Sequence, residues 1–216
     1  MGHKDKRPSP KITKLQATIL ILALCVGSVY ATRLALKKMR VDAGVVASRT
    51  KGNPKARIKI TEYLDFQCPA CAKGALLIRD ALHKYPSELY LEVKYFPIAS
   101  IHENTMQATS YVECAARQNK FWDYQYPLLE RQKDWAKALK PKFIFQDIAR
   151  QVGLDMPRLD VCLADENVTA AINRDRADGK SLGIESTPTY FLNGKMVVGH
   201  KTLIAELEKM LPGGQH

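Results

Sequence analysis

Two closely spaced cysteines, Cys68 and Cys71, are the side chains in this 216-residue sequence best suited to chemistry. They enclose Pro69 and Ala70 in the stretch ITEYLDFQCPACAKGALLIRDALHKYP. A Cys-x-x-Cys pair can ligate a metal, form a structural disulfide, or exchange disulfides with other thiols. The residues around the pair decide which of these chemistries is favoured.

A metal site at the pair would need further ligands. Cys114 and Cys162 have no close Cys or His companion, so we expect no metal. Haem attachment would need a histidine directly after the second cysteine, where Ala72 stands. A purely structural disulfide remains open, but it would close a very short loop and stabilise little. Redox exchange is therefore the favoured interpretation.

The flanking residues place the pair at the start of a helix. The β-branched and aromatic residues before it predict a strand, and the apolar residues after it recur at helical spacing. Cys68 would be the helix N-cap and Pro69 the first helical residue, where a missing N–H costs nothing. Unpaired N–H groups and the helix dipole should lower the pKa of Cys68, which we expect to be exposed. Cys71 would be its recessed partner.

The strand, helix and strand patterns around the two cysteines predict a βαβ unit with a right-handed crossover. We expect its strand, helix and strand at residues 56–66, 69–86 and 88–97.

The rest of the sequence predicts that this unit is part of a larger α/β domain. Residues 99–182 carry mostly helical patterns punctuated by prolines. Two further strands meet at Asn193-Gly194, a strong hairpin signal, and a final helix follows them. We therefore expect one mixed sheet from residues 55–98 and 183–216, with residues 99–182 as an all-helical insertion.

An uncharged apolar run from Leu15 to Thr32 precedes this domain and is long enough to span a membrane. We expect residues 1–14 to be a basic cytoplasmic segment, residues 15–36 a transmembrane signal-anchor, and residues 37–54 a linker. Cleavage near Ala31 is the alternative. Both interpretations export the domain to a compartment in which disulfides form.

The net charge of +11 is unevenly distributed along the chain. Residues 1–40 hold nine of the 33 Lys and Arg residues but only one of the 22 Asp and Glu residues, so the remainder is nearly balanced. Because the basic residues flank the apolar run, we expect the acidic partner to be the headgroups of a lipid bilayer, and not a nucleic acid.

Several motifs together resemble a known family. The βαβ unit with Cys-Pro-x-Cys at its helix, and the later stretch STPTYFLNG, resemble the thioredoxin fold. ECAARQNKFWDYQYPLL, VCL and GIESTPTYFLNGK resemble the membrane-anchored bacterial DsbA-like oxidoreductases. The resemblance covers about residues 50–212. It implies a thioredoxin fold with an all-helical insertion, DsbA-like, preceded by one N-terminal transmembrane helix.

The resemblance also implies site roles. Cys68 would be the attacking cysteine and Cys71 the resolving one. A buried acid would lie beneath their disulfide at Glu62, with a raised pKa, and would relay a proton to or from Cys71. A solvent-facing strand residue remains the alternative for Glu62. Support for the active site would come from Pro69, Ala70 and a cis-proline loop at Thr187 and Pro188.

The implied function is an exported thiol–disulfide oxidoreductase that introduces disulfides into secreted proteins. It would need no cofactor besides the Cys68–Cys71 disulfide. DsbA itself carries a histidine at the position of Ala70, so this chain lacks one stabiliser of the Cys68 thiolate. A threonine before the proline, as at Thr187, resembles the isomerase branches more than DsbA itself. Isomerase and reductase therefore stay open, as does a non-catalytic chaperone or metal-delivery module.

The implied partners are unfolded or reduced exported proteins and a quinone-linked membrane reoxidase of the DsbB or vitamin K epoxide reductase-like kind. The implied location is the inner membrane, crossed once through residues 15–36, with the catalytic domain on the periplasmic side.

Two other features remain. The part of the chain after the apolar run has four cysteines, and even pairing in an oxidising compartment favours a structural disulfide between Cys114 and Cys162, against two free buried thiols. His102 follows the second strand and could lie near the active site, but a helix-start or surface residue without a catalytic role is the favoured interpretation.

Overall fold

The computed structural model describes residues 13–211. The chain forms two units, Met1–Ala43 and Gly44–His216. Helix α1 begins in the first unit and spans Lys14–Ser48. The segment Leu15–Leu36 is long and apolar enough to cross a membrane, by its length of 22 residues and its composition. Residues 1–12 of the predicted cytoplasmic segment lie outside the described residues.

The predicted linker, residues 37–54, is wrong in part, because most of it has regular structure. Helix α1 extends to Ser48, and Thr50–Gly52 forms strand β1. The stretch begins with Lys37, Lys38, Met39 and Arg40, residue types that favour a helix. Arg49 is buried, donates to the Oδ2 atom of Asp175 at 2.5 Å, and lies over the ring of Tyr95. The domain therefore begins before the predicted boundary at residue 55.

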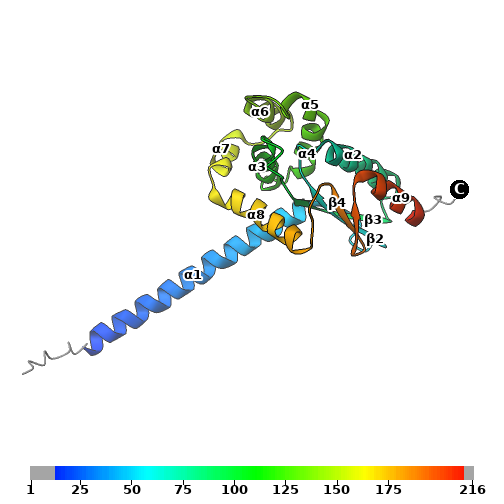
Figure 1. Ribbon diagram of the computed structural model, residues 1–216. Coiled ribbons are helices and arrows are strands. Elements are labelled where there is room, and N and C mark those ends of the chain that lie inside the picture. Colours follow the sequence, from blue (N-terminus) through cyan, green and yellow to red (C-terminus); the bar gives the residue numbers. More distant parts are fainter. Residues whose placement is uncertain (1–12, 212–216) are drawn as a thin grey trace, which may run out of the picture. The chain divides into compact units, whose positions relative to one another are not determined.

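The second unit contains a five-stranded sheet in the order β1-β3-β2-β4-β5 (Figure 1). Strands β2 and β3 are parallel, and every other neighbouring pair is antiparallel. A mixed sheet was predicted with four of these strands, and β1 is the strand that the prediction lacked. Besides β1, its strands are β2 (Ile58–Leu64), β3 (Leu89–Tyr95), β4 (Thr189–Leu192) and β5 (Lys195–Val198).

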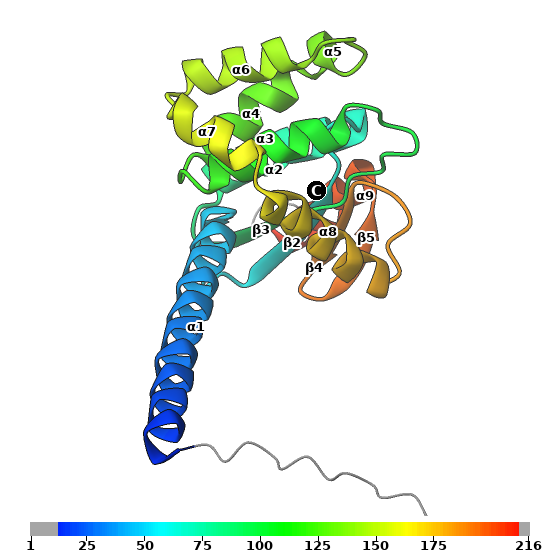
Figure 2. The ribbon, with the colours of Figure 1, turned by 90° about the vertical axis from the view of Figure 1, so that its left-hand side faces the viewer.

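Helices cover both faces of this sheet (Figure 2). On one face lie α2 (Pro69–Lys84) and α9 (His200–Met210). Helix α2 can approach β4 closely because Gly74 has no side chain: a Cβ there would lie 2.0 Å from the hydroxyl oxygen of Tyr190. On the other face lies α8 (Glu166–Ser181), where Gly179 packs against the ring of Tyr63.

The helical insertion follows β3 and ends with α8. In Figures 1 and 2 its other helices gather beside the sheet. One of them, the short α5, was not predicted, because a single helical turn leaves no periodic signal. These helices are α3 (Thr105–Ala116), α4 (Phe121–Glu130), α5 (Gln132–Trp135), α6 (Lys142–Gln151) and α7 (Met156–Leu163).

A disulfide joins α3 to α7 within this insertion. Cys114 and Cys162 are bonded, with their Cα atoms 5.8 Å apart and a sequence separation of 48 residues. Cys114 is fully buried, and Arg117, on the same helix, donates to Asp165 at the start of α8. The bond therefore ties the core of the insertion to its outer helices.

Removing this disulfide should destabilise the domain. A cross-link over about 50 residues limits the freedom of the unfolded chain, so we expect the Cys114→Ala/Cys162→Ala variant to lose about 2–5 kcal/mol of unfolding free energy. Urea unfolding of the oxidised variant and wild type, followed by circular dichroism, measures the difference. Equal midpoints would show that the bond contributes nothing to stability. Cys25→Ala, which alters the cysteine in the apolar segment, is the matched control.

Candidate active site

The two cysteines lie at the N-terminus of α2, directly after β2. Cys68 is the N-cap with extended backbone angles (φ −74°, ψ 121°), and Pro69 begins the helix. The carbonyl oxygen of Cys68 accepts hydrogen bonds from the N–H groups of Cys71 and Ala72. Proline fits the first helical position because no intrahelical bond is lost there. This is the strand–helix junction that the local sequence predicted.

The two thiols have opposite pKa shifts. The pKa of Cys68 is lowered to about 6, first by hydrogen bonding from the Cys71 thiol and then by the backbone N–H groups of Cys71 and Ala70, while burial acts in the opposite direction. The pKa of Cys71 is raised well above its usual value, mainly because the side chain is fully buried. Near neutral pH, Cys68 is therefore the thiolate and Cys71 the thiol.

Cys68 is less accessible than expected. The sequence predicted an exposed thiol, but only 8% of this residue is exposed. A second loop contributes to the cover: the Sγ atom of Cys68 lies 3.4 Å from the carbonyl oxygen of Thr187. The Thr187–Pro188 peptide bond is cis, and the Pro188 carbonyl oxygen accepts from the N–H of Gly199. The two loops that the sequence singled out therefore meet at the sulfur of Cys68.

Glu62 lies in the core, on β2. The residue is 0% exposed, so the solvent-facing alternative is excluded. Burial raises the pKa of Glu62 to about 8. Tyr190 on β4 is the strand partner of Glu62 on β2, and its hydroxyl lowers the pKa of Glu62 slightly against the effect of burial. The hydroxyl and the carboxyl do not reach hydrogen-bonding geometry. An unpartnered carboxyl in the core favours its protonated form at neutral pH.

Two residues that sequence reasoning did not assign to the site, Asp65 and His102, join it in the structure. Asp65 directly follows β2, before the turn at residues 66 and 67, and is completely buried. Its carboxylate lies 2.8 Å from Nδ1 of His102, and its backbone N–H donates to the sulfur of Cys71 at 3.5 Å. His102 lies at the start of α3, as the favoured interpretation expected, and its contact with Asp65 also places it near the cysteines, which was the alternative. The sequence held a weak signal for this contact: Asp65 and His102 each follow a strand of the predicted βαβ unit, and the ends of parallel neighbouring strands lie at the same edge of a sheet.

Two amide side chains, one from the insertion and one from the loop itself, connect the loop before Cys68 to the insertion. Gln132 donates to the carbonyl oxygens of Phe66 and Cys68 at 2.7 and 3.0 Å. Gln67 donates to the carbonyl oxygen of Ala136 at 2.7 Å. These bonds join the cysteine loop to the insertion, so the insertion helps to fix the geometry of the loop.

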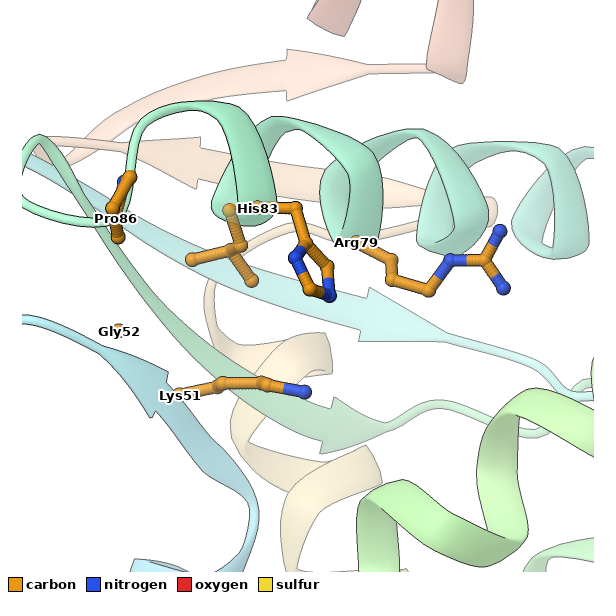
Figure 3. Close-up of a pocket in the computed structure, with 6 residues that line it drawn as sticks. Lys51, Gly52, Arg79, His83 and Pro86 are labelled. Carbon is orange, nitrogen blue, oxygen red and sulfur yellow. The ribbon is translucent and has the colours of Figure 1, made fainter.

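A separate pocket of about 400 Å³ lies at the opposite end of α2 (Figure 3). Lys51 reaches into it from β1, while Arg79 and His83 extend from α2. Because Cys68 precedes the first residue of this 16-residue helix and His83 is near its last, the pocket is distinct from the cysteine site. Within residues 13–211, no group of three or more His, Cys, Asp or Glu side chains is placed to hold a metal ion.

The family model described as thioredoxin matches residues 44–211. The chain belongs to the thioredoxin family. The match begins before β1, in agreement with the start of the domain in the structure. The predicted fold class is confirmed: a thioredoxin fold with a helical insertion.

Solved structures share the fold of this thioredoxin-family chain. BdbD from Bacillus subtilis has a TM-score of 0.65 and 20% identity, with 76% of this chain and 93% of that chain covered. α-DsbA1 from Wolbachia pipientis has a TM-score of 0.64 and 20% identity, with 74% and 89% covered. A thioredoxin-like oxidoreductase from Silicibacter pomeroyi has a TM-score of 0.62 and 23% identity, with 74% and 90% covered. The fold is therefore DsbA-like.

Among curated proteins, this thioredoxin-family chain matches much longer ones. Na(+)/H(+) antiporter NhaA 3 from Salinispora tropica is 30% identical over 145 residues, which are 67% of this chain and 21% of the antiporter. NhaA 1 from Mycolicibacterium gilvum is 28% identical over 149 residues, which are 67% of this chain and 23% of that protein. The chain thus spans about a fifth of the length of these relatives.

Proposed function

We propose that this protein is an exported thiol–disulfide oxidoreductase that introduces disulfides into secreted proteins. The observation that carries the proposal is the Cys68 thiol at the α2 N-terminus. Its pKa is lowered to about 6, beside a recessed Cys71 whose pKa is raised. A low-pKa thiol is a good leaving group, so a disulfide that contains it is easily transferred. The DsbA-like fold supports the same proposal.

The proposed cycle begins with the Cys68–Cys71 disulfide. A substrate thiolate attacks the sulfur of Cys68, the Cys68–Cys71 bond breaks, and Cys71 leaves and takes up a proton. A second substrate thiolate then attacks the substrate sulfur of the mixed disulfide, and Cys68 leaves as a thiolate. The substrate loses two electrons, which reduce the enzyme. A quinone-linked membrane oxidase of the DsbB or vitamin K epoxide reductase-like kind would reoxidise it.

Glu62 is proposed to exchange the proton of Cys71. Cys71 is fully buried, so the thiolate that leaves in the first step needs a nearby acid. Glu62 is equally buried, and with a pKa of about 8 it carries a proton at neutral pH. The carboxyl would donate this proton when Cys71 leaves and recover one during reoxidation.

The N-terminal helix supports the proposed location. Leu15–Leu36 would anchor the chain once in the inner membrane, with the catalytic domain on the periplasmic side. Unfolded or reduced exported proteins would be the substrates there. Thr187 and Pro188 would offer them an edge for backbone pairing beside Cys68.

The reduction potential of the pair tests the direction of this function. The full-length chain in detergent, with Cys25→Ala so that only Cys68 and Cys71 remain as free thiols, is equilibrated with glutathione and alkylated. We expect a value near about −120 mV, as in disulfide donors of the DsbA kind. A value near about −270 mV would mean a reductase instead. An unreactive pair that bound copper or zinc stoichiometrically would support the metal-delivery module.

A further inference from the structure

The buried carboxylate of Asp65 is surrounded by four hydrogen-bond donors. Its Oδ1 atom accepts from the N–H of Gln67 at 2.8 Å and from the hydroxyl of Thr105 at 2.5 Å. Its Oδ2 atom accepts from the N–H of Ile98 at 2.7 Å and lies 2.8 Å from Nδ1 of His102. A carboxylate only accepts hydrogen bonds, so Nδ1 of His102 carries the hydrogen.

These four donors come from three separate parts of the chain. Gln67 belongs to the cysteine loop, Ile98 and His102 follow β3, and Thr105 begins α3. Asp65 therefore fastens the loop that precedes Cys68 to the start of the helical insertion. The imidazole ring of His102 is partly exposed at the surface, with 17% of its side chain accessible.

The same residue contacts the redox centre through its backbone. The N–H of Asp65 donates to the sulfur of Cys71 at 3.5 Å, and its carbonyl oxygen accepts from the N–H of Cys68 at 3.1 Å. A thiol or thiolate sulfur accepts such a bond better than a disulfide sulfur does. Whatever fixes the position of Asp65 thus favours the reduced form of the pair.

We propose that His102 is a positioning residue for the Cys68–Cys71 centre. By donating to the Asp65 carboxylate, it holds the N–H of Asp65 against Cys71. A buried carboxylate that loses a donor is costly, so the loop would move to find another partner or water. This inference rests on the proposed thiol–disulfide function and identifies a residue outside the Cys-Pro-Ala-Cys motif that tunes it.

The test compares three variants of the full-length chain in detergent, all with Cys25→Ala. His102→Ala removes the donor, while His102→Asn places an amide N–H where Nδ1 stood. His83→Ala, which removes an exposed histidine near the other end of α2, is the matched control. The readouts are the glutathione equilibrium of the pair and the rate of Cys68 alkylation by iodoacetamide.

We expect His102→Ala to shift the glutathione equilibrium about tenfold toward the oxidised pair, or about 30 mV toward a more negative potential. Alkylation of Cys68 should slow. His102→Asn should restore most of both values, and His83→Ala should match the parent. A parental equilibrium in a folded His102→Ala variant would overturn the proposal. A shift that asparagine does not restore would overturn it too, because lost packing would then be the cause.

A second pair of variants, at Thr105, tests the same contact with Asp65. If His102→Ala does not fold, Thr105→Val removes a donor from the other carboxylate oxygen with little change of shape. The expected shift then has the same sign, with Thr105→Ser as its rescue. Both readouts belong to the thiols themselves, so they can be measured even if the protein fails to oxidise any substrate. A failure of the proposed function is thereby distinguished from a failure of the His102 proposal.

Discussion

Replacing Cys68 by alanine is expected to reduce thiol–disulfide exchange to the uncatalysed background. Cys68 is the thiol whose pKa is lowered to about 6, and it contacts the Thr187 loop. Cys71 is fully buried with a raised pKa, so it cannot replace Cys68 as the attacked sulfur. The measurement is the reactivation of a reduced, unfolded client containing disulfides, with glutathione as the terminal oxidant. Exchange at the wild-type rate in Cys68→Ala would refute the proposed function.

The matched variant Cys71→Ala is expected to behave differently. It keeps the attacking sulfur but lacks the resolving one, so a mixed disulfide between Cys68 and the client should accumulate. Non-reducing electrophoresis followed by mass spectrometry identifies the linked cysteine. Linkage through Cys25 or another cysteine, with none through Cys68, would contradict the assigned roles. Cys25→Ala is again the neutral control.

Glu62 is expected to make the folded protein less stable as the pH rises from about 4.5 to about 8. Its pKa of about 8 in the folded protein lies above its usual value of 4.5, so the folded state holds the proton more tightly than the unfolded chain does. The stabilisation is complete below the lower value and is lost as the pH rises through the higher one. The loss amounts to at most about 5 kcal/mol.

The variant Glu62→Gln should lack this loss, because glutamine is close in shape and does not titrate. Urea unfolding of the oxidised protein across that pH range measures the effect, since neither Cys68 nor Cys71 titrates as a disulfide. Glu208→Gln, which changes an exposed glutamate on α9, is the control and should follow wild type. Parallel curves for wild type and Glu62→Gln would mean that the carboxyl is ionised in the folded state.

The outcome of each sequence prediction follows from how local its signal is. Cys68 and Pro69 were placed at a helix start because the apolar pattern and the proline position are local, and the structure agrees. The helices of the insertion have periodic apolar residues, so their existence could be predicted. Strand β1 and helix α5 were missed, since three or four residues carry no period.

Burial of Glu62 could not be derived from the pattern of its own strand. Residues on β2 from Glu62 to Leu64 are all buried, because α2 covers one face of the sheet and α8 the other. A strand buried on both faces loses the alternation that shows which side chains face inward. The resemblance to a family, and not the strand pattern, suggested a buried acid there.

The sequence by itself determined the position of Cys68 and Cys71 at a strand–helix junction, the order of the longer elements, and an apolar segment long enough for a membrane. Only the tertiary structure decided the contact between Asp65 and His102, the cover over Cys68 by the Thr187 loop, and which cysteine of the pair is fully enclosed. These features join segments separated by 37 and 119 residues in the chain. Such contacts depend on the pairing of β2 with β3 and β4, because strand order, and not local propensity, brings the ends of those strands together.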